Sequence, residues 1–152
     1  MRRALHPRDP DLVALVEGAR NSAREAAVFA AQTALERTPV SDHPVPEALN
    51  ALRTHQTATA IRLRPQLEAL VERLDGVYWD LSDGSDSKRA PAVREAFARA
   101  RAVNSLVAAL TIDPVSAAVD AIYEAQASLP EAEVDAFIEA ARRILRPLQV
   151  RK

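Results

Sequence analysis

One stretch of the sequence, Ala102–Leu110, carries no charged residue and is apolar on nearly every side when drawn as a helix. It is the second half of Ala92–Ile112, whose first half alternates charged residues with alanine. A helix that is apolar all round has to be enclosed by other helices, because any uncovered flank would face water. We therefore predict that this stretch is the central helix of a bundle. The side chains that should be buried in it are Val103, Leu106, Val107 and Leu110.

Ten prolines divide the rest of the chain, and most of them lie where a helix is expected to begin. Proline suits the first turn of a helix because its missing N–H has no partner there. Between the prolines, apolar residues recur every three to four positions, as on one face of a helix, and no segment alternates with the period of a strand. The predicted helices cover residues 10–37, 47–53, 65–81, 91–111, 114–128 and 130–148. Residues 55–62 remain ambiguous between a helix and a connection, and residues 82–88 are predicted to be an exposed loop.

These features predict an all-α fold, a single-domain bundle of five to six helices around the central apolar helix. The domain spans residues 1–152, with short flexible ends at 1–8 and 149–152. A chain of 152 residues is long enough to bury about 70% of the surface that its unfolded form exposes. Alanine is the most frequent residue, which suits closely packed helices. Self-association through an alanine-rich face, to form a homodimer, is a further expectation.

The charge balance and the lack of cysteine exclude several classes of protein. The chain has 20 basic and 21 acidic residues, a net charge of -1, which argues against a general polyanion binder and against an electrostatic membrane anchor. Without cysteine there is no disulfide scaffold, zinc ribbon or thiol nucleophile. No apolar run follows Arg2 and Arg3 as in a signal peptide, and none approaches the length of a membrane span. We therefore expect a cytoplasmic protein that does not associate with membranes.

The sequence also lacks the patterns of metal, cofactor and catalytic sites. No two of its three histidines, His6, His43 and His55, have the i, i+4 spacing of a helical metal site. The aspartate-rich region around Gly84 fails the EF-hand pattern, because Trp79 would take the first ligand position. Glycine-rich phosphate loops, GxSxG elbows and paired-carboxylate motifs are absent from the sequence. We expect no metal, no cofactor and no catalytic residue.

The candidate binding residues are Asp75, Tyr78, Trp79, Arg101 and Asn104. Tyr78 and Trp79 are the only adjacent aromatic pair, and a tryptophan off the core face either marks a partner surface or covers the end of the bundle. Asn104 falls within the apolar arc of the central helix, where a buried amide needs partners. It either fixes the register of two helices or lines a small polar pocket. Arg101 is placed to form an ion pair across a helix interface. The carboxylates expected within its reach are Asp75, Asp80 and Asp120.

Four segments carry a family resemblance, and in chain order they are AREAAVFAAQTALER with DHPVPEALNALR, then LVERLDGVYWDL, then AFARARAVNSLVAALTIDPVSAAVDAIYEA. Together they resemble uncharacterised, alanine-rich, all-helical proteins of actinobacteria. The junction DHPVPEAL is similar, more distantly, to immunity proteins of bacterial toxin systems, small helical proteins that neutralise a cognate toxin by binding it. The resemblance implies a non-enzymatic binding role and carries over no catalytic residue.

We therefore expect a protein that is not an enzyme and that acts by binding another protein, in an immunity-like role. Two alternatives remain. The first is a helical bundle with a small-ligand or enzymatic pocket near Asp75, Arg101 and Asn104. The second is a nucleic-acid-associated regulator that uses the basic residues at the two ends of the chain. Nucleic acid is the less favoured partner, because the sequence lacks a helix-turn-helix turn and interleaved aromatic residues.

Overall fold

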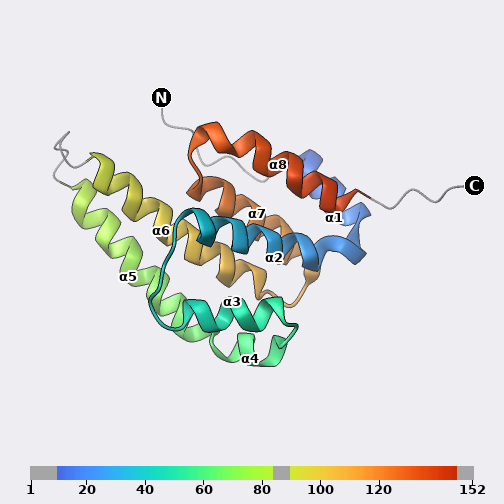
Figure 1. Cartoon of the computed structure of the whole chain (residues 1–152), viewed down its shortest axis with the longest axis horizontal. Helices are drawn as coiled ribbons and strands as arrows, with labels where there is room; N and C mark the ends of the chain where they lie inside the picture. Colours follow the sequence, from blue (N-terminus) through green and yellow to red (C-terminus); the bar gives the residue numbers. More distant parts are fainter. Residues whose placement is uncertain (1–9, 84–89, 147–152) are drawn as a thin grey trace, which may run out of the picture.

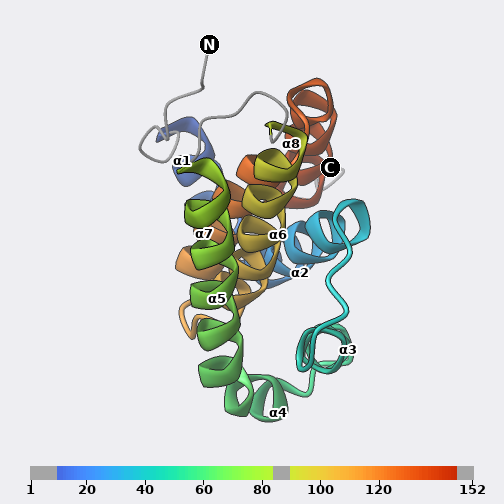
Figure 2. The ribbon, with the colours of Figure 1, turned by 90° about the vertical axis from the view of Figure 1, so that its left-hand side faces the viewer.

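The computed structural model describes residues 10–83 and 90–146, and within these ranges every regular element is an α-helix. The helices are α1 (Pro10–Gly18), α2 (Arg20–Arg37), α3 (Val45–Arg53), α4 (Thr57–Arg62), α5 (Arg64–Ser82), α6 (Ala90–Ala109), α7 (Pro114–Ser128) and α8 (Glu131–Leu145). The all-α prediction is confirmed, whereas the described residues form eight helices instead of five or six. Figures 1 and 2 show α5 alongside α6. The helix α8 packs on α2 and α7, on the side of the bundle away from α5. Most of the predicted 82–88 loop, both chain ends and Leu148 lie outside the described residues.

The prediction for the central helix is confirmed in α6. Val103 and Leu106 have no exposed surface, and Val107 and Leu110 are buried. They are covered because α6 packs against α2, α3, α5 and α7. The helices α2 and α7 also pack on each other, so three mutually contacting helices form the middle of the bundle.

The contact between these three helices is made largely of alanine. The fully buried alanines of α2 and α7 are Ala23, Ala26, Ala27, Ala30, Ala31, Ala34, Ala117, Ala118, Ala121 and Ala125. Small side chains at a helix contact shorten the distance between the two axes. These alanine faces are therefore enclosed within the chain and leave self-association to some other surface.

The helix predicted over residues 10–37 is divided into α1 and α2, so the prediction of one continuous helix was wrong. The division is at Ala19, whose φ of -122° and ψ of 43° are not helical. Gly18 directly precedes the break and lowers its free-energy cost, since glycine weakens a helix by about 1 kcal/mol relative to alanine. As a result α1 packs on α7 and α8, while α2 packs along α6 and α7.

The ambiguous residues 55–62 contain the short helix α4, which lies against α3 (Figure 2). The end of α3 explains how the chain turns there. His55 has a positive φ of 63°, and its N–H donates to the Leu52 carbonyl at 3.3 Å. The Gln56 N–H donates to the Ala51 carbonyl at 2.8 Å. These two bonds make a Schellman motif, which ends one helix and redirects the chain into the next.

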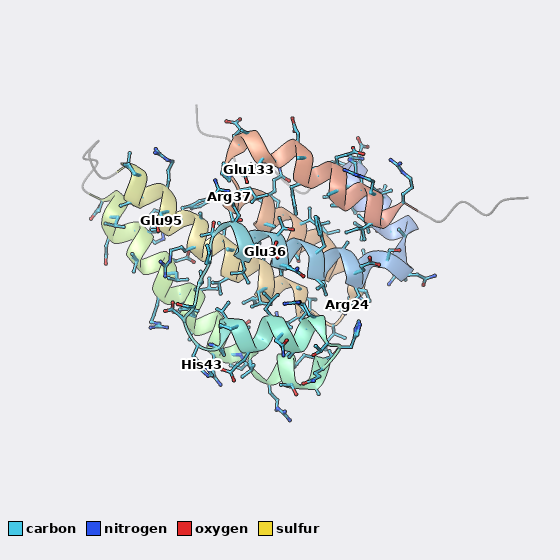
Figure 3. All side chains as sticks on the ribbon, viewed as in Figure 1. Arg24, Glu36, Arg37, His43, Glu95 and Glu133 are labelled. Atoms are coloured by element: carbon cyan, nitrogen blue, oxygen red, sulfur yellow. The ribbon has the colours of Figure 1, made fainter. Side chains whose placement is uncertain are left out.

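The C-terminal end of α6 is held by Arg24 of α2 (Figure 3). Nη1 of Arg24 donates to the carbonyls of Ala109 at 2.8 Å and Thr111 at 3.1 Å, and Nη2 donates to that of Ile112 at 2.9 Å. The last carbonyls of a helix lack partners within the helix, and the helix dipole favours a cation beside them. One guanidinium therefore ties the end of the central helix and the turn into α7 to α2.

The next helix, α7, begins at a capping aspartate, Asp113, directly before the proline at which the sequence predicts its start. The carboxylate of Asp113 accepts the Ser116 N–H at 2.9 Å, and Pro114 follows in the first turn. The pKa of Asp113 is lowered from its ordinary value of 3.8, first by this backbone bond and then by the Ser116 side chain. Arg20, whose Nη1 lies 3.4 Å from the carboxylate, lowers the pKa of Asp113 further by a smaller amount.

We expect Arg24→Ala to lower the free energy of unfolding by about 2 kcal/mol, because the end of α6 would lose a charged donor to three carbonyls. Arg20→Ala is the matched control: its ion pair with Asp113 is exposed, and its loss should cost less than about 1 kcal/mol. Urea unfolding of both variants measures the difference. Equal losses would show that Arg24 contributes no more than a surface ion pair.

The stability that Asp113 contributes should depend on pH. Because its pKa is lower in the folded chain than in the unfolded one, its charge stabilises the fold above pH 3.8 and loses this effect as the pH falls further. Asp113→Asn keeps a capping oxygen but cannot ionise. The midpoint of thermal unfolding should therefore be higher for the wild type than for this variant at neutral pH, and the two midpoints should converge in acid. A difference between the midpoints that stays constant across the whole pH range would contradict a lowered pKa of Asp113.

Candidate functional site

An open cleft of about 1640 Å³ lies at one end of the bundle. The N-terminal half of α6 and the C-terminal end of α5 form one wall, and the corner between α7 and α8 forms the other. Figure 1 shows the α5–α6 pair projecting past this corner. The length of the helices accounts for the projection, because the 20 residues of α6 exceed the 15 of α7 by about 7.5 Å of helix.

The wall that α5 and α6 form is aromatic. The ring of Tyr78 lies 5.1 Å from that of Trp79 and 5.3 Å from that of Phe97, measured between centroids. All three line the cleft, and Tyr123 of α7 joins them. Trp79 is 65% exposed. A cleft with an exposed tryptophan at its edge is the kind of surface in which a few aromatic residues supply most of the binding energy.

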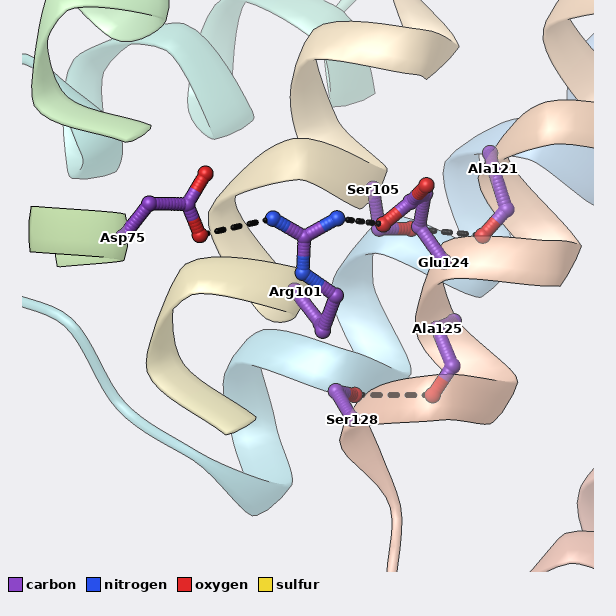
Figure 4. A network of polar contacts seen from close by, with 7 residues as sticks. All are labelled: Asp75, Arg101, Ser105, Ala121, Glu124, Ala125 and Ser128. Atoms are coloured by element: carbon purple, nitrogen blue, oxygen red, sulfur yellow. Dashed lines mark hydrogen bonds and ion pairs between the residues drawn. The ribbon is translucent and has the colours of Figure 1, made fainter. Parts of the chain in front are cut away.

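The opposite wall is shaped by the turn between α7 and α8. The hydroxyl of Ser128 donates to the Ala125 carbonyl at 2.7 Å (Figure 4), and Pro130 prevents α7 from continuing. Leu129 is extended, with φ -88° and ψ 151°, as expected of a residue before proline. The corner therefore turns within two residues, and it places apolar side chains of α8 along the cleft. These are Val134 and Ile138.

Charged side chains also line the cleft. Glu131, Asp135 and Glu139 follow one another at intervals of four along α8, and all three line it. The sequence shows this spacing, and of the three only Glu131 lies in the first turn, where the helix dipole favours an acidic residue. Arg37 and Glu133 tie α2 to α8 beside the cleft, with Nε of Arg37 2.9 Å from both carboxylate oxygens (Figure 3).

Next to the cleft, Arg101 of α6 bridges two carboxylates from neighbouring helices (Figure 4). Its Nη2 lies 2.9 Å from Asp75 of α5, and its Nη1 lies 2.7 Å from Glu124 of α7. The side chains of Arg101 and Glu124 are only 17% and 13% exposed. The expected pairing with Asp75 is present. Glu124 was missed because the sequence suggested Asp120, one turn earlier, and only the packing of α6 on α7 decides between them.

The buried polar residue of α6 is Ser105, so the expectation that Asn104 occupies this position was wrong. Ser105 has no exposed surface, and its hydroxyl donates to the Ala121 carbonyl at 2.8 Å (Figure 4). Asn104 is half-buried. Neighbouring positions on a helix differ by about 100° in direction, so a small error in the predicted buried face exchanges the two residues.

The structure does not bring the five sequence-predicted residues together in one site. Tyr78 and Trp79 line the cleft, whereas Asp75, Arg101 and Asn104 do not. Both Nη atoms of Arg101 already contact carboxylates. Phe97 and Tyr123, which the sequence did not single out, belong to the cleft instead, since their direction depends on how α6 and α7 pack.

Within residues 10–83 and 90–146, no group of three or more acidic or histidine side chains is arranged to hold a metal ion. Over the same residues, Asp113 has a clearly shifted pKa. It begins α7, whereas the cleft lies at the other end of that helix.

We expect Arg101→Met to lower the free energy of unfolding by about 3 kcal/mol, because it would leave the carboxylate of Glu124 nearly buried without its cation. Adding Glu124→Gln should restore much of this loss, since the carboxylate that then still lacks its cation, Asp75, is 37% exposed and solvated by water. The control is Arg64→Met, which removes a partly exposed pair with Glu68 and should cost less than about 1 kcal/mol. Chemical denaturation of the wild type and the three variants measures their free energies of unfolding. Equal losses in Arg101→Met and Arg64→Met would refute a role for this ion pair.

Comparisons with known proteins add no further assignment. Protein-family models, curated proteins and solved structures all give no match to this chain. No helix in the described part of the chain combines the length and the apolar character needed to cross a membrane. A function is therefore inferred from the geometry of the cleft and from the sequence.

Proposed function

We propose that this chain is a non-enzymatic binding protein that takes a segment of another protein into the cleft between α6 and α8. The observation that carries this proposal is the 65% exposure of Trp79 at a cleft of about 1640 Å³. Tryptophan is costly to leave in water and is enriched among residues that dominate protein interfaces. The cytoplasmic location and the absence of catalysis expected from the sequence form part of the proposal.

The size of the cleft favours a macromolecular segment over a small molecule. Pockets for small ligands enclose about 300–1,000 Å³ and surround most of the ligand. This cleft is larger and stays open to solvent along one side. Apolar and aromatic side chains line it together with charged ones, and protein interfaces likewise combine apolar contact residues with polar ones.

The immunity-like role is the specific form of binding that the family resemblance supports. In that role, the chain would neutralise a toxin by covering part of its surface without any chemical step. A rigid binding face suits this task, because little entropy is then lost on association. The Arg37–Glu133 pair joins α2 to α8 beside the cleft, and the Arg101 bridge joins α5, α6 and α7 next to it.

The test is affinity capture from a lysate of the source organism, with proteins quantified by mass spectrometry for wild type and for Trp79→Ala. A bound partner should fall by about 30-fold in the variant, the loss expected of an interface anchor worth about 2 kcal/mol. Ile112→Ala is the matched control, since Ile112 is an exposed apolar residue at the other end of α7. A partner retained equally by both variants would refute binding through the cleft.

A further inference from the structure

The charges of the α8 wall indicate what kind of segment the cleft accepts. Asp135 and Glu139 line the cleft and are exposed, and within the described part of the chain neither is paired with a cation. Glu131 precedes them by four residues on the same side of α8. Carboxylates four residues apart lie about 6 Å from each other along a helix. Cations at i and i+4 of a second helix have the same separation.

The α6 wall has no comparable excess of one charge. Arg94 and Glu95 are neighbours there and offset each other. Arg99 lies 3.7 Å from Asp42 of the α2–α3 connection. What this wall offers instead is the aromatic surface of Trp79 and Phe97. The cleft thus has an acidic stripe along α8, beside Val134 and Ile138, and an aromatic surface on the wall that α5 and α6 form.

Accepting that the cleft binds a protein segment, we propose that its occupant is a basic amphipathic helix of another protein. Its apolar face would pack on the aromatic wall, in the way that amphipathic helices fill apolar grooves. Its lysine or arginine residues, spaced three to four apart, would lie along Asp135 and Glu139. An acidic or neutral helix could use the aromatic wall but would leave these carboxylates without partners.

Two synthetic peptides of about 18 residues, or about five helical turns, test the proposal. Both carry leucine on one face, and the other face carries lysine in one peptide and glutamate in the other. Calorimetric titration should show the lysine peptide binding at least about tenfold more tightly, with a shift in the emission of Trp79, the single tryptophan. Trp79→Ala should weaken this binding.

The variant Asp135→Asn/Glu139→Gln should weaken the lysine peptide about tenfold at low salt, the loss of two rim ion pairs. This difference should vanish in about 1 M salt, where charges are screened beyond about 3 Å. Glu17→Gln/Glu25→Gln is the matched control. It removes the same charge from exposed positions of α1 and α2 that do not line the cleft, and it should change the affinity by less than about twofold.

Several outcomes would overturn the proposal, and they differ in what they say about the cleft. Equal affinity for both peptides would refute the basic chemistry while leaving protein binding at the cleft intact. Equal effects of the two double variants would refute the role of the α8 wall. Binding of neither peptide would also refute a basic helix as the occupant. Whether the cleft binds a protein at all is decided separately, by affinity capture with wild type and Trp79→Ala. A dimer that Trp79→Ala dissociates, measured by light scattering, would place a second copy of this chain in the cleft instead.

Discussion

The structure depends above all on the removal of water from the C-terminal half of α6. Val103 and Leu106 are fully buried because α2, α5 and α7 surround them. Burying an aliphatic side chain of this size contributes about 1.5–3 kcal/mol to the free energy of unfolding. No single neighbouring helix could cover all sides of α6. The other helices therefore take positions that complete this enclosure, and the bundle has no alternative centre among the described residues.

Apolar burial alone would leave the helices free to slide past one another, and a few polar contacts remove that freedom. Arg24 binds the last carbonyls of α6 from α2, Ser105 binds a carbonyl of α7, and Arg101 joins α5, α6 and α7. Each contact has one geometry, because hydrogen bonds are directional. The alanine-rich faces make close approach easy, and these contacts decide the register at which it occurs.

The cleft is a consequence of the same packing. The enclosure of α6 is complete only over its C-terminal half, where α2 and α7 accompany it. Beyond the turn at Leu129 and Pro130, the chain leaves α7 and returns as α8, so that the first half of α6 is covered by α5 on one side and faces the cleft on another. Trp79 is exposed in this region beside the half-buried Tyr78, Phe97 and Tyr123, which connects the architecture directly to the proposed binding role.

The sequence by itself determined the helical class, the burial of Val103, Leu106, Val107 and Leu110, and the start of a helix at Pro114, and it named Asp75 among three carboxylates within reach of Arg101. These depend on periodicity, on proline and on capping, which are local properties of the chain. Only the tertiary structure decided the break at Ala19, the choice of Glu124 over Asp120, the burial of Ser105 in place of Asn104, and the existence of the cleft. These depend on the rotation and the relative length of packed helices, and an error of one residue, about 100° around a helix, is enough to change which side chains meet.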